Sequence, residues 1–415
     1  KKYLPLHIPF SMSQSLTPFH TKSPLLVLAP HLLYPLRNGG DIGVVEHWGP
    51  LSRYIPYVII LGADTITRYE DGHIVHQSTF ENTFRNSKIA GLRTLLKRSH
   101  YLIEKFLTPR YRQVANEYLA DPIFQNIVCS HLWSTTLFNF TGKERFVIIQ
   151  SHNDDFQWFQ HLANHAANLP ARLAALASKN WTTQFMRKHA LDYWFFHCTE
   201  RDQAGYAAAS PCHHSFVMPV GVDIQTEYAD ALPPTDNLHL IFTGSLSVTM
   251  NFDALCTFRD QFLPALKVAF GNSLEISVVG SHPTVAVQNL CDDQGWNLFA
   301  NVSDTELMQL YQKATFSILP FPYATGSKLK LLKSLSYGVP FLSTTHSSPG
   351  EMPDLPFCVF SDAPEHWVTK AKEATLKGIS VEQRNALLAY AQQFSWTALA
   401  EKMIEQLNNL AEGPK

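Results

Sequence analysis

The 415-residue sequence lacks several features that mark specialised classes of protein. Its six cysteines include no CxxC pair and follow no metal-site or disulfide spacing, which favours a reducing cytoplasm. No apolar run reaches the roughly 20 residues of a transmembrane helix. The first residues carry no signal-peptide pattern, although a sequence that starts at Lys1 leaves room for a leader. The formal net charge of −2 does not indicate a nucleic-acid partner.

What the sequence does contain is the alternation of strands and helices that is typical of a soluble α/β protein. Hydrophobic residues make up 45% and charged residues 16%, and the length suffices for two domains with separate cores. Short apolar runs predict strands in the first half at 25–29, 57–61, 127–130, 146–150, 193–198 and 215–218. A helix at 43–54 between the first two strands completes a parallel βαβ unit, and helical spacing continues through 158–189.

The same pattern restarts in the second half, which predicts two doubly wound, Rossmann-like domains with a cleft between them. Strands are expected at 238–242 and 274–279, and helices at 251–262 and 304–313. We place an extended arm at 1–23, the first domain at 24–219 and the second at 220–392. An amphipathic helix within 393–415 could pack back against the first domain.

The segment from Ile318 to Gly350 carries the clearest chemical signal. A strand at 316–319 leads through a Gly-containing turn into a helix at 328–337, and a second strand follows at 339–343. Such a turn presents free N–H groups and the positive end of the helix dipole, a common phosphate site. Lys328 and Lys330 add positive charge there. We predict that this segment binds the phosphates of a nucleotide; the alternative is that both lysines are solvated.

Four motifs in a defined order carry a resemblance to a known family. They are His152-Asn153-Asp154-Asp155, Val217 to Asp223, Ile241 to Leu246 with Asn251 after it, and Gly326 to Lys330 continuing to Gly338-Val339-Pro340. Their order and spacing resemble those of the retaining glycosyltransferases of the GT-B fold, of the family 4 type (glycosyl transferases group 1). The resemblance spans about 25–396 and is strongest in the second half.

The resemblance implies that a sugar moves from a nucleotide-sugar to a glycan, lipid-linked or other hydroxyl acceptor. It implies retention of the anomeric configuration, a role in polysaccharide biosynthesis, and no metal or cofactor beyond the nucleotide-sugar substrate. His152 would contact the donor sugar and serve catalysis. The residues implied in donor binding are Gly244, Ser245, Ser327, Lys328, Lys330, Asn301 and Val302, and the loop beside the acceptor and phosphate holds Gly39 and Gly40.

Two positions depart from the family pattern. The family usually has two glutamates around the phosphate-binding helix, which contact the donor sugar and the ribose, but Thr325 and Lys333 stand in their places. The chain therefore either uses an unusual donor or is an inactive relative that binds nucleotides or carbohydrates. A phosphorylase or epimerase on the same fold is a third reading.

Each site residue also has a plain structural alternative. His152, one of 19 histidines, follows a strand and could be structural, although its pKa would let it hydrogen-bond a sugar hydroxyl or shape the acceptor side near neutral pH. Asp154 and Asp155 could bind a metal, but an N-cap and first-turn pair is preferred. An ordinary Asn-Gly turn explains Gly39 and Gly40 as well as a ligand loop does. Asp304 could simply cap a helix.

The segment 85–112 has a basic and amphipathic character. It holds eight basic residues against the single acid Glu104, and its apolar residues recur at helical spacing. One reading is docking on anionic lipid or an anionic acceptor, with peripheral attachment at the inner membrane face of the cytoplasm. The other, slightly preferred, is that the apolar stripe packs on the sheet.

Overall fold

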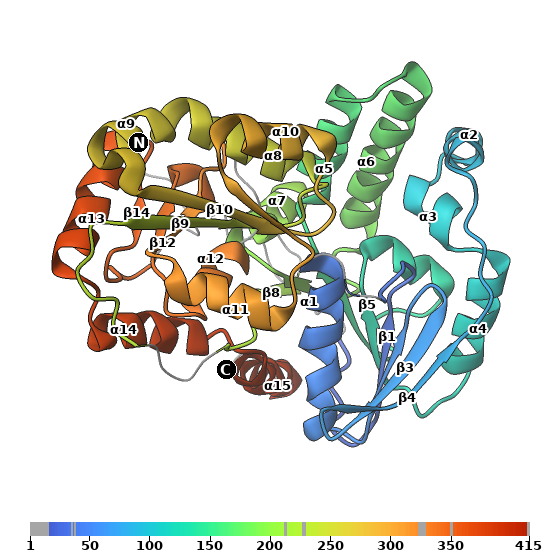
Figure 1. Ribbon diagram of the computed structural model, residues 1–415. Coiled ribbons are helices and arrows are strands. Elements are labelled where there is room, and N and C mark those ends of the chain that lie inside the picture. The colour runs from blue at the N-terminus through green and yellow to red at the C-terminus, as the bar shows by residue number, and fades with distance from the viewer. Residues whose placement is uncertain are drawn as a thin grey trace, which may run out of the picture. The chain divides into compact units, whose positions relative to one another are not determined.

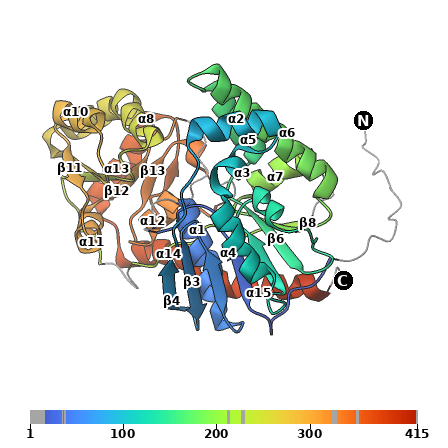
Figure 2. The same cartoon turned by 90° about the vertical axis from the view of Figure 1, so that its right-hand side faces the viewer.

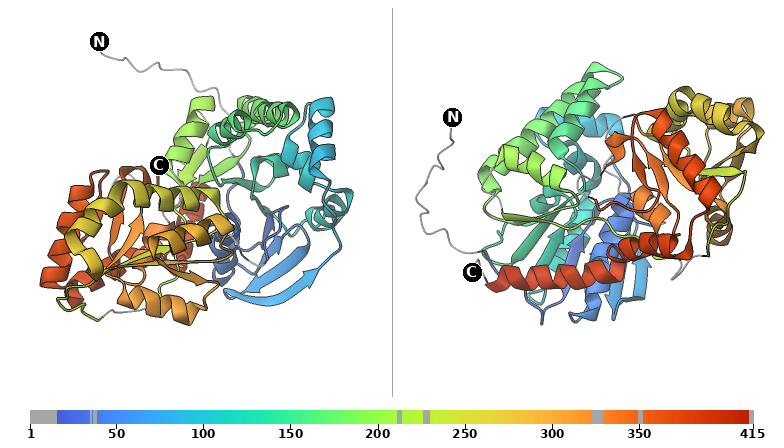
Figure 3. Two further views of the ribbon diagram at one scale, coloured as in Figure 1. Left: turned by 45° about the horizontal axis from the view of Figure 1, so that its top comes forward. Right: turned by 90° about the vertical axis from the view of Figure 1, so that its left-hand side faces the viewer.

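The computed structural model describes residues 16–34, 36, 39–210, 214–225, 230–322, 329–348 and 352–412. The chain divides into two compact units, the first comprising 1–219 with 400–415 and the second 220–399. The helix α15 (Trp396–Glu412) is continuous, with its first residues in the second unit and the rest in the first (Figure 3). Of the predicted arm at 1–23, residues 1–15 lie outside the described part.

The first unit is built on an eight-stranded sheet in the order β4-β3-β2-β1-β5-β6-β7-β8 (Figure 1). Neighbouring strands from β2 to β8 are parallel, whereas β3 is antiparallel to both β2 and β4. The strands are β1 (Leu25–Leu28), β2 (Val58–Leu61), β3 (Thr65–Glu70), β4 (His73–Thr79), β5 (Asn126–Cys129), β6 (Phe146–Ser151), β7 (Trp194–His197) and β8 (His214–Val217).

Helices cover both faces of this sheet, because its central strands are apolar on both sides. One face packs on α4 and α6 through a core that includes Tyr111, Trp133 and Met186. On the other face Trp48 of α1 packs on Phe196 and donates its indole N–H to Gln150. The helices are α1 (Gly39–Trp48), α2 (Ser87–Lys97), α3 (Tyr101–Phe106), α4 (Pro109–Leu119), α5 (Asp155–Asn164), α6 (Leu169–His189) and α7 (Glu200–Ala209), with 3₁₀ segments η1 (Gly49–Arg53) and η2 (Leu132–Leu137).

Two predictions for the first unit need correction, and one hairpin was missed. The predicted helix at 43–54 begins earlier, at Gly39, and changes to the 3₁₀ segment η1 after Trp48. The helical stretch at 158–189 is two helices, because Asn168 caps the second one through its bond from the Ala171 N–H and Pro170 follows at its start. The β3–β4 hairpin was not predicted.

The second unit is an open sheet of six parallel strands in the order β11-β10-β9-β12-β13-β14. Helices α8 to α10 lie on one face and α11 on the other (Figure 1). The strands are β9 (Leu238–Thr243), β10 (Leu274–Gly280), β11 (Asn297–Ala300), β12 (Phe316–Leu319), β13 (Phe341–Ser343) and β14 (Val359–Phe360). The helices are α8 (Thr249–Thr257), α9 (Leu263–Phe270), α10 (Val285–Gln294), α11 (Asp304–Lys313), α12 (Leu329–Leu335), α13 (Pro364–Lys377) and α14 (Val381–Gln392).

Parallel strands in this order leave their carboxyl ends at one edge of the sheet, where ligands of doubly wound folds usually bind. The loop after β9 begins at Gly244, and β12 runs towards α12, which carries Lys330. The fold therefore brings two of the predicted motifs to adjacent strand ends, because β9 pairs with β12.

Candidate functional site

In the second unit, Lys330 links the end of β9 to α8. Its ammonium Nζ donates hydrogen bonds of 2.8 Å to the Thr243 carbonyl and 2.8 Å to Asn251 Oδ1. The same nitrogen lies 5.1 Å from the ring centre of Phe242 and 5.3 Å from that of Phe321. Lys330 is thus held at the carboxyl edge of the sheet, and it is not the freely solvated lysine of the structural alternative.

Burial lowers the pKa of Lys330 to about 7. A neutral amine has two N–H bonds, and both would be used by Thr243 and Asn251. A third donor exists only when Lys330 is protonated. The negative charge of an anion at this point would favour protonation of Lys330. Binding of a phosphate and uptake of a proton by Lys330 are therefore expected to be coupled.

Two glycines allow this arrangement. A Cβ on Gly244 would lie 2.2 Å from Lys330 Nζ, and a Cβ on Gly280 would lie 1.7 Å from the Gly244 carbonyl oxygen. Neither position can therefore hold a side chain without displacing the lysine or separating the two loops. The Gly244 N–H was expected to face the diphosphate, but it donates to the Val279 carbonyl at 3.1 Å. The Ser245 N–H has no backbone acceptor among the described residues.

The predicted phosphate turn is described only in part. Ser327 and Lys328, as well as Thr325, lie outside the described residues. The helix α12 is also shorter than predicted, since it ends at Leu335 and the chain then turns through Gly338, whose φ is 66°. In the described part of this motif, the positive charge comes from Lys330 and Lys333.

Lys333, at a position where the resemblance implies a glutamate, interacts electrostatically with two acids. Burial lowers its pKa, and the charges of Asp223 and Asp304 oppose that shift. Its Nζ also lies 5.2 Å from the ring centre of Tyr337. A lysine at this position has the opposite charge to the glutamate that the resemblance implies.

Asn301 and Val302 lie in the loop after β11, as predicted, but both have structural contacts. Asn301 has a φ of 54° and accepts the His282 N–H on its side-chain oxygen at 3.1 Å. Val302 packs against the core beside α11. The cap of α11 is Ser303, which forms a capping box with Glu306, so the suggestion that Asp304 is the cap is wrong.

In the first unit, three histidines gather at the carboxyl ends of neighbouring strands. His31 follows β1, His131 follows β5 and His152 follows β6. The ring centres of His131 and His152 are 4.7 Å apart, and those of His31 and His131 are 5.3 Å apart. Ser130 Oγ lies 3.1 Å from His152 Nε2. Of these, only His152 was predicted; the signal for the other two is a histidine two or three residues beyond an apolar strand.

Burial keeps these imidazoles neutral. It lowers the pKa of His31 to about 4 and that of His152 to about 3, and it holds the pKa of His131 well below 6.5. A neutral imidazole can still accept a hydrogen bond on one nitrogen and donate one from the other, as a site for sugar hydroxyls requires.

The start of α1 contributes to the same edge. Asp41, in its first turn, lies 3.6 Å from His31 Nε2. Gly39 and Gly40 form the beginning of this helix, so they are not a loop or an Asn-Gly turn as predicted. The helix is fixed at its other end, where His47 contacts the carbonyls of Gly43 at 2.6 Å and Pro219 at 3.0 Å.

The two aspartates after His152 are capping residues. Asp154 accepts the N–H groups of Phe156 and Gln157, both at 3.0 Å, which confirms the preferred reading of an N-cap. Asp155 in the first turn accepts the Tyr206 hydroxyl at 2.9 Å. No three His, Cys, Asp or Glu side chains among the described residues are grouped to hold a metal ion.

Asp155 should make stability depend on pH. Burial raises its pKa to about 7, the Tyr206 hydrogen bond opposes this, and the charges of Asp154 and Asp202 add to it. The native state then binds a proton that the unfolded state loses near pH 4, so stability falls as pH rises from about 4 to 7. The variant Asp155→Asn is expected to be more stable at pH 8 by about 2 kcal/mol and little changed near pH 4.

Thermal unfolding of both proteins at the two pH values measures this difference. Glu117→Gln, at an exposed carboxylate of α4, is the control and should show no such pH dependence. An equal melting-temperature change at both pH values would contradict the assignment of the buried proton to Asp155.

The α2 helix exposes its apolar stripe. Ile89, Leu92 and Leu96 have exposed fractions of 55%, 59% and 76%, so this part of the segment 85–112 does not pack on the sheet as preferred. The helix packs beside α3 and α6 (Figure 2). On the inner side Arg93 donates to the buried Glu104 at 2.8 Å. No described helix is long and apolar enough to cross a membrane.

Comparison with known proteins identifies the second unit. Residues 237–375 match the model of the protein family described as Glycosyl transferases group 1. This segment of the second unit is therefore similar to glycosyl transferases group 1. The match covers β9 to α13, and it confirms the family that the sequence motifs predicted. No curated protein matches the chain significantly.

Solved structures show that the whole chain has the GT-B fold, which confirms the predicted fold class. HepE from Anabaena, in complex with UDP and glucose, has 12% identity and a TM-score of 0.53, covering 93% of this chain and 100% of its own. A glycosyltransferase from Rickettsia africae has 12% identity and a TM-score of 0.58, covering 95% of this chain and 100% of its own. The N-terminal domain of a trehalose-6-phosphate phosphatase from Candida albicans has 8% identity and a TM-score of 0.58, covering 95% of this chain and 98% of its own.

Proposed function

We propose that the protein is a glycosyltransferase that moves a sugar from a nucleotide-sugar to a hydroxyl group of a glycan or lipid-linked acceptor. The observation that carries the proposal is the position of Lys330, whose amine has a pKa of about 7 and is bonded to the end of β9 within the segment that matches glycosyl transferases group 1. In its protonated form, this amine can stabilise the negative charge that develops on a leaving diphosphate. We propose further that the transfer needs no metal and retains the anomeric configuration.

The neutral histidines of the first unit suit the sugar side of this reaction. His31, His131 and His152 present ring nitrogens at the strand ends, where hydroxyl groups need both donors and acceptors. Asp41 beside His31 adds a carboxylate acceptor. In our proposal, this set forms hydrogen bonds with hydroxyl groups of a sugar.

The experiment is an incubation of the full chain with a panel of UDP-, GDP- and dTDP-sugars. UDP-glucose comes first, because HepE was solved with UDP and glucose. A transferase should release free nucleotide slowly even without an acceptor, and faster when glycan fractions are added. Absence of nucleotide binding and of release across the panel would refute the proposal.

A second candidate, an inactive relative that binds nucleotides, is favoured by Lys333. A lysine beside Asp223 and Asp304 cannot accept a hydrogen bond from a sugar hydroxyl while it is protonated. Nucleotide binding without turnover on any donor and acceptor would support this candidate. The Lys333→Glu variant discriminates further, since a gain of turnover would identify the lysine as the cause of inactivity.

We also propose that the exposed stripe of α2, formed by Ile89, Leu92 and Leu96, contacts an anionic membrane surface. Lys88 and Lys97 are exposed on the same helix, and apolar residues flanked by lysines are typical of interfacial helices. The variant with all three apolar residues changed to serine should bind anionic vesicles at least about tenfold more weakly in sedimentation. Val268→Ser, at a residue that is 90% exposed in α9, is the control and should bind unchanged. Equal binding of wild type and triple variant would refute this contact.

A further inference from the structure

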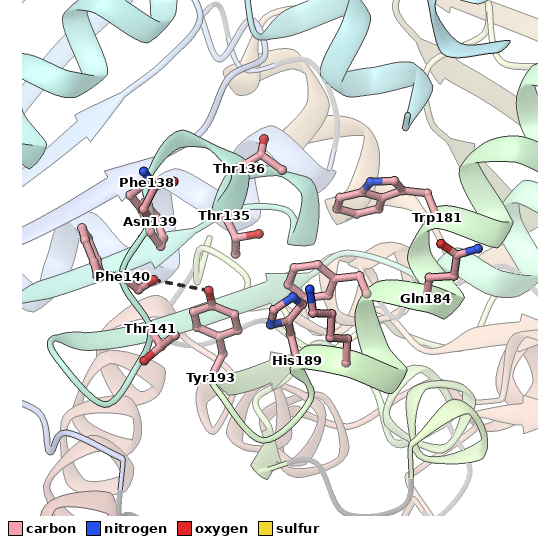
Figure 4. Close-up of a pocket in the computed structure, with 12 residues that line it drawn as sticks. Thr135, Thr136, Phe138, Asn139, Phe140, Thr141, Trp181, Gln184, His189 and Tyr193 are labelled. Carbon is pink, nitrogen blue, oxygen red and sulfur yellow. Dashed lines mark hydrogen bonds between the residues drawn. The ribbon is translucent and has the colours of Figure 1, made fainter. Parts of the chain in front are cut away.

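A pocket in the first unit lies apart from the histidines just described. It has a volume of about 370 Å³ and opens between the 3₁₀ segment η2 with the loop that follows it and the last turns of α6 (Figure 4). Tyr193, which precedes β7, forms part of its wall. No step of the proposed reaction uses this pocket, and its size is that of sites for small ligands.

Buried rings separate this pocket from the histidine cluster. Trp181 of the pocket lies 5.4 Å from His100, whose ring is 6.3 Å from Trp133, and Trp133 is stacked on His131 at 5.1 Å. His100 and Trp133 are almost fully buried, with exposed fractions of 0% and 1%. The pocket and the histidine cluster are therefore connected through packed aromatic rings, and no histidine of the cluster lines the pocket.

The pocket wall carries a row of aromatic rings. Trp181 and Phe185 have ring centres 5.4 Å apart and planes 23° apart, and Phe185 and Tyr193 have centres 6.1 Å apart and planes 10° apart. The faces of aromatic rings are negative, so they attract the slightly positive C–H groups of a sugar ring. The three rings are stacked in sequence, and together they form the apolar strip of this wall.

Polar groups that both donate and accept hydrogen bonds surround this strip. Asn139 and Gln184 contribute exposed carboxamides, and the exposed Thr136 hydroxyl, which donates to the Trp133 carbonyl at 2.9 Å, adds an acceptor. Sugar hydroxyls need such partners, because each one donates and accepts as well. The Tyr193 hydroxyl donates a hydrogen bond of 3.4 Å to the Phe140 carbonyl, which holds the loop at the rim of the pocket (Figure 4).

The charge of the lining narrows the choice of ligand. Lys188 lines the pocket and is exposed, while the lining residues include no Asp or Glu. An acyl chain would need an enclosed apolar cavity, whereas this lining mixes rings with amides and hydroxyls. The lining therefore fits a neutral or acidic saccharide.

We infer that this pocket, here called the Trp181 pocket, binds a saccharide unit of a glycan acceptor at a distance from the hydroxyl that reacts. The inference rests on the proposed function for the role of acceptor, but binding of the saccharide itself does not depend on it. An enzyme with such a second contact gains affinity for long acceptors and little for short ones, because only long acceptors span both sites.

The test measures direct binding of short oligosaccharides of glucose, of N-acetylglucosamine and of uronic acids to the full chain by saturation-transfer NMR and calorimetry. At least one of these should bind, and Gln184→Ala and Lys188→Ala should each weaken it by about tenfold. Both changes are at exposed positions and should leave folding intact. Arg172→Ala, which removes an exposed charge from the same helix, is the control.

The outcomes separate this inference from the proposed function. Saccharide binding that the pocket variants weaken, together with no nucleotide binding, would sustain the pocket and refute the transferase. Turnover of a nucleotide-sugar without saccharide binding, or with pocket variants that bind and use long acceptors like wild type, would overturn the pocket. In the expected result, the pocket variants raise KM for long acceptors at least fivefold and leave UDP affinity and activity on short acceptors unchanged.

Discussion

Replacing Lys330 with alanine is expected to weaken nucleotide binding about a hundredfold. The ammonium would form a charge-assisted hydrogen bond with a phosphate oxygen, and such bonds contribute up to about 3 kcal/mol. The loss should be largest for nucleoside diphosphates and small for the nucleoside alone, because only the phosphates face this group. Calorimetric titration of UDP and uridine, or of whichever nucleotide the panel identifies, measures both.

Several comparisons make this result interpretable. Lys267→Ala, at an exposed lysine of α9, removes the same charge far from β9 and should bind normally. Gly244→Ala should imitate the loss, since its Cβ would displace the Lys330 ammonium. An unchanged diphosphate affinity in a folded Lys330→Ala protein would refute the assigned role.

The affinity of the wild type should also fall as pH rises through about 7. The third N–H of Lys330 is present only below the pKa that burial has lowered to about 7, so each further pH unit costs up to tenfold in affinity. This slope should vanish in Lys330→Ala. A slope that persists in the variant would assign the titration to another group, such as the phosphate itself.

Replacing His152 with alanine is expected to lower kcat about a hundredfold while changing nucleotide affinity less than threefold. The neutral imidazole contacts Ser130 and lies among His31 and His131, on a unit that holds no part of the Lys330 site. A group that orients a sugar hydroxyl acts mainly on the transition state, so turnover falls more than donor binding does. Steady-state kinetics with calorimetry on the same preparations separates the two.

His161→Ala, at an exposed histidine of α5, is the matched control and should behave as wild type. His152→Asn should recover part of the activity, because an amide can replace one imidazole hydrogen bond. Between pH 5 and 8, the pH profile of kcat should have the same shape in wild type and variant, since burial lowers the pKa of His152 to about 3. Equal losses of kcat and affinity would reduce His152 to a binding residue.

Much of the fold could be predicted because its central strands are short apolar runs. β12 at 316–319 and α11 at 304–313 match their predicted bounds, since strong apolar patterns and a capping box define them locally. The β3–β4 hairpin was missed although Asp71-Gly72, with φ of 47° and 78°, is a strong turn signal. Its strand β4 is exposed along its length, so it lacks the apolar alternation on which strand prediction depends.

The candidate site was less predictable, because its contacts join residues far apart in the sequence. Motif order indicated Lys330, but its bond to the Thr243 carbonyl involves a backbone atom that no side-chain pattern can mark. The N–H of Gly244 was predicted to bind the phosphate. In the structure this N–H bonds to the Val279 carbonyl, and the lack of a side chain at Gly244 leaves space for Lys330. His31 and His131 were missed because their meaning depends on strand order, which brings β1, β5 and β6 together.

A lysine whose amine is largely neutral at physiological pH is also a nucleophile. Exposed lysines of ordinary pKa are protonated and react slowly with aldehydes, whereas Lys330 would present a lone pair. A small uncharged aldehyde, followed by reduction of the imine, should therefore label Lys330 before the exposed lysines. Protection by a nucleotide would then report occupancy of the site without any knowledge of the sugar that the protein uses.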